Sequence, residues 1–176
     1  IDYDNDGDRD LFVANGHIHD NIEEFDDIGT YAQRKLLYRN LGDGRFEERG
    51  AHSGSGMADR RVSRGAAIGD YDNDGDYDIV INNVGGSASL LRNDGGSGGG
   101  WLRVALEPPA LAVGARVWVT PTRGAKLLHE AHTGGSYASH GDGRPLFGLG
   151  DSATAALRVE WPDGATSVLK EARAGS

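Results

Sequence analysis

Two runs of closely spaced aspartates are the residues in this sequence best suited to chemistry. They read DYDNDGDRD at residues 2–10 and DYDNDGDYD at residues 70–78, with eight of nine positions identical. Five carboxylates at alternate positions repel one another strongly when they ionise side by side. A bound cation removes this repulsion, so the two runs predict two metal-binding loops.

The spacing of the oxygen donors indicates which metal these loops bind. In the pattern D-x-D-x-D-G-x-x-D, positions one, three, five and nine offer carboxylates, position seven offers a backbone carbonyl, and glycine at position six allows a sharp turn. An all-oxygen donor set without His or Cys favours Ca²⁺. The predicted ligands of the first loop are Asp2, Asp4, Asp6, Asp8 through its carbonyl, and Asp10. Those of the second loop are Asp70, Asp72, Asp74, Asp76 through its carbonyl, and Asp78.

An EF-hand and a solvated acidic turn both fit the aspartate runs less well. An EF-hand needs a bidentate Glu at position twelve and a helix after it, whereas position twelve is Val13 in one copy and Ile81 in the other. A solvated acidic turn does not account for two near-identical copies with glycine at the same place. We expect the calcium to be structural, because the sequence shows no amphipathic helix pair that calcium would open.

The segments around the loops repeat as well. Apolar, β-branched runs follow both loops, at residues 11–13 and 79–81, and predict that each loop leads into a strand. A second repeated segment pairs Leu37-Tyr38-Arg39-Asn40 with Leu90-Leu91-Arg92-Asn93. Between the aspartate loop and this segment, the first copy carries 15 additional residues, which we place within residues 16–35. Repeats of this length indicate stacked β-units that bury their apolar faces against each other.

The charge distribution divides the chain into two halves. Residues 1–95 contain 20 of the 27 acidic residues and 10 of the 18 basic ones, and the net charge of the chain is −9. A nucleic-acid partner is excluded, because binding a phosphate backbone needs a basic surface. No apolar run has the roughly 18 residues of a membrane helix, so membrane insertion is not expected. The chain has no cysteine, which excludes disulfides and zinc thiolate sites.

The sequence pattern of the second half of the chain predicts a small β-domain. The glycine-rich run at residues 95–100 predicts a flexible joint, which divides the chain into residues 1–95 and 96–176. Alternating runs bounded by Gly or Pro predict strands at residues 101–106, 115–120, 126–132, 157–161 and 166–169. The segment Trp161-Pro162-Asp163-Gly164 predicts a hairpin turn. We therefore expect a β-sandwich after the joint and an all-β protein throughout.

The chain resembles a known family along nearly its whole length. The stretch RGAAIGDYDNDGD at residues 64–76 and the stretch LYRNLGDGRF at residues 37–46 resemble the signature of FG-GAP/VCBS-type repeats. The motifs VGARV at residues 113–117, FGLG at 147–150 and WPDG at 161–164 resemble the landmarks of the ASPIC/UnbV domain, in the order of that family. The chain is thus similar to the cartilage acidic protein-like family, in which FG-GAP/VCBS repeats precede a C-terminal ASPIC/UnbV domain.

This resemblance implies a fold and a location. It implies that the repeats are blades of a β-propeller with calcium in inter-strand loops, and that the protein is secreted or at the cell surface. A closed propeller takes about four to eight blades, whereas the sequence contains one nearly full unit and part of another. We expect either a fragment of a longer protein or blades completed by neighbouring chains, which would give a homo-oligomer or fibre.

The functional prediction is a calcium-stabilised extracellular protein with a structural, adhesion or matrix role and no catalysis. A filament subunit built by inter-chain strand pairing is one alternative. A non-catalytic accessory module that binds glycans is another, and Phe25 and Tyr31 in the insertion would suit a protein or glycan contact. Two enzyme-like patterns carry little weight. The G-x-S-x-G match at residues 95–99 lacks a strand before it and a helix after it, and Ser139, His140 and Asp142 lie in a predicted surface turn.

Overall fold

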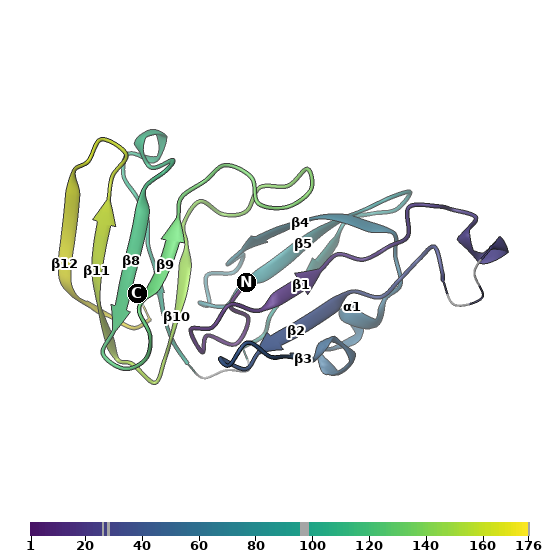
Figure 1. Ribbon diagram of the computed structural model, residues 1–176, viewed down its shortest axis with the longest axis horizontal. Coiled ribbons are helices and arrows are strands. Elements are labelled where there is room, and N and C mark those ends of the chain that lie inside the picture. The colour runs from purple at the N-terminus through teal and green to yellow at the C-terminus, as the bar shows by residue number, and fades with distance from the viewer. Residues whose placement is uncertain (26, 28, 96–98, 176) are drawn as a thin grey trace.

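The computed structural model describes residues 1–25, 27, 29–95 and 99–175, and shows an all-β protein (Figure 1). Within these ranges, 12 strands form four antiparallel sheets, and none of the sheets closes into a barrel. The described part of the chain contains no helix long and apolar enough to cross a membrane. The all-β prediction is therefore confirmed at the level of the sheets.

The first repeat folds into a three-stranded sheet in the order β1-β2-β3. Its strands are β1 (Leu11–Val13), β2 (Leu36–Asn40) and β3 (Phe46–Glu48). Among its described residues, the insertion between β1 and β2 contains a short 3₁₀ turn, η1 (Ile22–Glu24). In the register of this sheet, Phe12 lies opposite Leu37, whose side chain is buried.

The second repeat folds into a sheet of the same kind, in the order β4-β5-β6. Its strands are β4 (Ser63–Gly69), β5 (Asp78–Asn83) and β6 (Ser89–Leu91). The short helices η2 (Gly50–His52) and α1 (Ser55–Ala58) connect the two repeats. The strand runs predicted after the two aspartate loops correspond to β1 and β5, so that prediction is confirmed.

The two repeats differ in one neighbour. In the second sheet β4 pairs with the edge of β5 that faces away from β6. In the first sheet no described strand pairs with the corresponding edge of β1. Ile79 and Ile81 of β5 are 6% and 0% exposed, but the equivalent residues of β1, Leu11 and Val13, are 51% and 39% exposed. The repeat spacing of 68 residues places the counterpart of β4 at and before Ile1, so the first sheet has no such strand within this sequence.

The second half of the chain forms two sheets around one core. A four-stranded sheet has the order β12-β11-β8-β9, and a two-stranded sheet pairs β10 with β7. The strands are β7 (Gly100–Arg103), β8 (Arg116–Pro121), β9 (Leu127–Glu130), β10 (Leu146–Gly150), β11 (Thr154–Glu160) and β12 (Thr166–Arg173). A third 3₁₀ turn, η3 (Pro109–Leu111), precedes β8. Phe147, 2% exposed, joins Val117, Val119 and Leu102 in the core.

The strand predictions for this half are confirmed in position, with two differences. Each predicted run coincides with a strand, and Trp161 closes the β11–β12 hairpin by donating its N–H to the Ala165 carbonyl at 2.9 Å. Strand β10 was not predicted, because its sequence Leu-Phe-Gly-Leu-Gly is buried on both sides and shows no alternation. The flexible joint predicted at residues 95–100 falls largely on residues 96–98, which lie outside the described residues.

Hydrogen bonds join the two halves at the first aspartate loop and at β4. The Gly150 N–H donates to the Asn5 carbonyl at 2.9 Å, and the Asp142 N–H donates to the Ile68 carbonyl at 2.8 Å. The Tyr77 hydroxyl donates to the Leu146 carbonyl at 3.1 Å and accepts the Leu146 N–H at 2.8 Å. In Figure 1 the sandwich sheets stand beside the repeat sheets, and the long loop after β9 reaches over towards β4. The aspartate loops thus lie at the junction of the two halves.

Candidate metal centres

The first aspartate loop gathers three of its predicted ligands. One carboxylate oxygen each from Asp2, Asp4 and Asp10 lies within 4.8 Å of the others. Asp2 and Asp10 are only 4% and 3% exposed. Oδ1 of Asp2 and Oδ1 of Asp4 are buried and have no hydrogen-bond partner among the described residues. Buried, unpaired carboxylate oxygens that converge on one point are the donor set that a hard cation requires.

The second loop repeats this arrangement 68 residues later. Asp70, Asp72 and Asp78 bring their carboxylate oxygens within 4.8 Å of one another. In both loops the glycine at position six donates its N–H to the first aspartate, from Gly7 to Asp2 at 3.1 Å and from Gly75 to Asp70 at 3.2 Å. Both glycines have φ above +90°, a left-handed backbone that other residues rarely adopt. The sharp turn predicted at position six is therefore present in both copies.

The last aspartate of each loop fixes the loop to its sheet. Asp10 accepts the N–H of Tyr3 at 3.0 Å through one oxygen and the N–H of Asn40 at 2.8 Å through the other. Asp78 accepts the N–H of Tyr71 at 2.8 Å and the N–H of Asn93 at 2.8 Å in the same way. The two motifs found by sequence, D-x-D-x-D-G-x-x-D and Leu-x-Arg-Asn, therefore meet through this carboxylate, which explains why both recur together.

Four predicted ligands lie outside the two tight groups. Asp6 Oδ1 accepts the Asp8 N–H at 2.9 Å, and Asp74 Oδ1 accepts the Asp76 N–H at 3.0 Å, so both side chains brace the turn. Asp76 Oδ1 accepts the side-chain amide of Asn5 at 2.7 Å. Calcium ligation by all ten aspartates stays a prediction, and these four lie outside the groups whose oxygens the structure brings within 4.8 Å.

The electrostatics of the metal-free loops are unfavourable. Burial raises the pKa of Asp2 from 3.8 to about 7, and the nearby Asp6 and Asp10 carboxylates add to the rise. Burial also raises the pKa of Asp76 to about 6, with Asp74 and Asp70 adding to it. The pKa values of Asp4 and Asp10 are raised in the same direction, with burial as the largest cause. A divalent cation would reverse these shifts, because it favours the ionised carboxylates.

Arginines that the sequence analysis did not assign to the site partly neutralise the loops. Arg39 forms ion pairs with Asp4 at 2.9 Å and Asp6 at 3.1 Å, and Arg92 lies 3.9 Å from Asp72. Both arginines belong to the repeated Leu-x-Arg-Asn motif, and this repetition was the feature of the sequence that could have indicated their role at the loops. Arg103 of β7 adds an ion pair to Asp70 at 2.8 Å.

The two loops also contact each other. The side-chain amide of Asn5 in the first loop donates to the Gly75 carbonyl at 3.0 Å and to Asp76 at 2.7 Å in the second. Asn5 and its equivalent Asn73 both have positive φ values, 55° and 62°. Asn tolerates this conformation better than most residues. The two candidate centres therefore form one connected unit.

The enzyme-like cluster in the second half has no catalytic geometry. Ser139 Oγ donates to the Tyr137 carbonyl, His140 Nδ1 accepts the Gly134 N–H, and Asp142 is paired with Arg144. Each group is engaged with a partner outside the cluster, whereas a triad needs the hydroxyl, the imidazole and the carboxylate hydrogen-bonded in series. The G-x-S-x-G match at residues 95–99 lies mostly outside the described residues.

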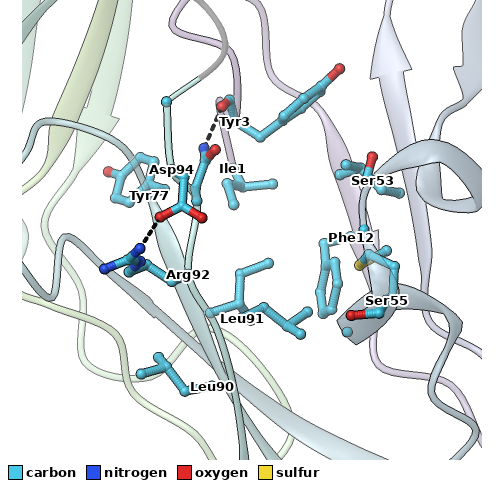
Figure 2. A pocket seen from close by; sticks show the side chains of 17 residues that line it. Ile1, Tyr3, Phe12, Ser53, Ser55, Tyr77, Leu90, Leu91, Arg92 and Asp94 are labelled. Atoms are coloured by element: carbon cyan, nitrogen blue, oxygen red, sulfur yellow. Dashed lines mark hydrogen bonds and ion pairs between the residues drawn. The ribbon is translucent and has the colours of Figure 1, made fainter.

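A cavity of about 630 Å³ lies between the two repeat sheets (Figure 2). Phe12, Leu91 and Ile1 line its interior, and an ion pair between Arg92 and Asp94 lies on its rim. The Asn93 side chain closes the adjacent side by donating to the Tyr3 carbonyl at 2.7 Å. The apolar lining assigns this cavity to the loosely filled core between the sheets rather than to a site of polar chemistry.

The fold and the site together define a class of protein, an all-β repeat protein with paired aspartate loops followed by a β-domain. Comparison with family models agrees. Residues 2–81 match the FG-GAP-like repeat family, and residues 106–176 match the family described as ASPIC and UnbV. Residues 2–81 are thus similar to FG-GAP-like repeats and residues 106–176 to an ASPIC and UnbV domain, which confirms the resemblance drawn from the motifs of the two halves.

Curated relatives of the chain carry one name. Cartilage acidic protein 1 of Homo sapiens is 27% identical over 135 residues, which cover 74% of this chain and 20% of that protein. The Mus musculus protein of the same name is 27% identical over 135 residues, covering 74% and 21%. The Xenopus tropicalis protein is 30% identical over 105 residues, covering 57% and 16%. The chain spans about a fifth of the length of the curated relatives it matches.

Proposed function

We propose that this chain is a calcium-stabilised, non-catalytic module of an extracellular matrix-type protein. The observation that carries the proposal is the duplicated aspartate loop, in which three carboxylates converge in the same way twice. Ca²⁺ bound there would supply the charge that the buried carboxylates lack in the metal-free loops. The similarity to cartilage acidic protein 1 supports the extracellular location and the matrix role.

On this proposal the two repeat sheets are blades of a β-propeller. In each sheet an aspartate loop leads into a strand, β1 or β5, which pairs with the strand that carries the Leu-x-Arg-Asn leucine. The match to the FG-GAP-like repeat family supports the assignment. The calcium ions would fix the loops that lead into β1 and β5. Their role would be structural, since loss of metal would release the entry to each blade.

The test is a calcium titration of the whole chain by isothermal calorimetry, together with thermal melts in calcium and in chelator. We expect about two Ca²⁺ per chain, weaker binding of Mg²⁺, and a higher melting temperature in calcium. Asp72→Ala and Asp74→Ala should lower calcium affinity and the melting temperature together. Asp151→Asn, at an exposed aspartate outside the loops, is the matched control. Unchanged calcium binding and melting in both loop variants would refute the proposal.

A further inference from the structure

A second cavity, of about 480 Å³, lies where the two halves of the chain meet. Its walls come from the first aspartate loop, β4, the end of β9, and the loop of residues 135–143. Two contacts hold this loop over β4, from the Ala66 N–H to Ser136 Oγ at 3.4 Å and from the Asp142 N–H to the Ile68 carbonyl at 2.8 Å. The volume lies in the range of small-ligand sites, and the position between two structural units is where such sites are common.

The charges that line the cavity are unusual for an acidic protein. Arg9 lines it and makes no ion pair with any residue that the structure describes. The two acidic residues in the walls are already neutralised. Arg144 donates to Oδ1 of Asp142 at 3.1 Å and to Oδ2 at 2.6 Å, and the Glu130 carboxylate lies 3.3 Å from Arg116. Among the side chains that line the cavity, Arg9 is left with a positive charge that no described carboxylate pairs.

Imidazole groups line the same cavity as Arg9. His129, His132 and His140 all line the cavity, and the rings of His129 and His132 lie 5.8 Å apart. The Gly134 N–H donates to Nδ1 of His140 at 2.9 Å, so the Nε2–H of that ring is the remaining donor. Burial, with help from Arg9, lowers the pKa of His129 to about 4, so this ring is neutral at physiological pH and carries one N–H donor. The walls thus offer hydrogen-bond donors as well as a cation.

We propose that this cavity binds the oxyanion group of a small carboxylate- or sulfate-bearing ligand, with Arg9 as the charge partner and His132 and His140 as neighbouring donors. A guanidinium matches the planar fork of a carboxylate and two oxygens of a sulfate. Arg9, His132 and His140 are exposed, so a ligand can reach them from solvent. Carboxylate and sulfate are the charged groups of acidic sugars, so the site would serve the glycan-binding alternative raised by the sequence. It is independent of the calcium centres, because none of these three residues is a predicted metal ligand.

The experiment is isothermal calorimetry on the whole chain with saturating calcium, using sodium sulfate, sodium glucuronate and neutral glucose as probes. We expect a dissociation constant of about 1 mM or tighter for at least one of the two anions and no heat with glucose. Binding of sulfate alone would assign the site to sulfated ligands, and binding of glucuronate alone would assign it to carboxylates. Absence of binding by both anions at tens of millimolar, or equal binding of glucose, would overturn the proposal.

Variants locate the binding. Arg9→Gln should weaken the anion at least tenfold, Arg9→Lys should weaken it less because the charge remains, and His132→Gln should weaken it severalfold. Arg158→Gln, which removes an arginine paired with Glu160 on β11, is the matched control and should leave the affinity within twofold. Because Arg9 lies between Asp8 and Asp10, calcium stoichiometry and the melting temperature are measured for each variant. Arg9→Gln protein that binds calcium normally and the anion as tightly as wild type would refute the assignment.

Discussion

The substitution Asp2→Asn should stabilise the protein in chelator and destabilise it in calcium. Asp2 is 4% exposed, and one of its oxygens has no partner among the described residues. Its pKa rises from 3.8 to about 7 in the folded, metal-free chain, because burial and the neighbouring Asp6 and Asp10 disfavour the charge. Asparagine keeps the shape of the Asp2 side chain and removes its charge, whereas calcium binding needs the ionised carboxylate as a ligand.

The size of the effect follows from that shift. A rise of about three pKa units corresponds to roughly 4 kcal/mol of cost for ionising Asp2 at pH 8. The carboxylates share their repulsion, so we expect about half of this, ~2 kcal/mol, to be recovered by Asn in chelator. For a chain of this size, that raises the melting temperature by roughly 4–8 °C.

The sign with pH follows from the same shift. The folded metal-free chain holds a proton on Asp2 that the unfolded chain has already lost between about pH 4 and pH 7, so wild-type stability in chelator falls as pH rises through this window. Asp2→Asn should reduce this dependence of stability on pH. Saturating calcium should abolish the contribution of Asp2, because the metal keeps this carboxylate ionised at both pH 4 and pH 7.

The assay is thermal melting at pH 5 and pH 8, in calcium and in chelator, with Asp151→Asn as the charge-matched control. In calcium at pH 8 the Asp2→Asn variant should melt below wild type, and in chelator above it. The reasoning is refuted when Asp2→Asn melts below wild type in both conditions, or when the control reproduces the reversal.

Three further substitutions test other parts of the structure. Phe147→Ala removes a side chain that is 2% exposed in the sandwich core, and should cost about 3–5 kcal/mol in urea denaturation; a loss below ~1 kcal/mol would contradict the core assignment. His129 has a pKa lowered to about 4, so wild-type stability should fall as pH drops from 6.5 towards 4; His129→Leu should flatten this fall in urea titrations at pH 7 and 4.5, and parallel curves would contradict it. Gly75→Ala adds a Cβ that overlaps the Trp101 indole and should lower the melting temperature more than Gly124→Ala, whose Cβ meets open space at a similar φ; equal losses would show that only the backbone conformation matters.

The sequence was sufficient for the parts of the fold that repeat. The identical aspartate motifs located both loops and the strands that follow them, because local spacing determines both the turn and the entry into β1 and β5. Alternation with Gly and Pro boundaries located most strands of the sandwich. Strand β10 escaped this reasoning, since a strand buried on both sides has no polar face and its glycines read as a turn.

The contacts that connect the site could not be predicted in the same way. The bond from Asn5 to Asp76 spans 71 positions, and nothing local marks Asn5 as the residue that joins the two loops. The arginines of the Leu-x-Arg-Asn motif were visible as a repeat, but their pairing with Asp4 and Asp72 depends on which sheet edge faces the loop. The positive cavity at Arg9 was hidden for another reason. It combines segments from both halves of the chain, and each segment alone is an ordinary loop or strand.

The position of the first aspartate loop at the junction has a mechanical consequence. Its Asn5 carbonyl accepts a hydrogen bond from the Gly150 N–H of β10, so part of any tension between the repeats and the sandwich passes through the backbone that the candidate calcium site braces. On the proposed function, the metal sets the bending stiffness of the joint. The chain would act as one rigid rod segment where calcium is abundant, and as two jointed segments where it is scarce. A matrix assembled from such units would transmit force according to the calcium concentration around it.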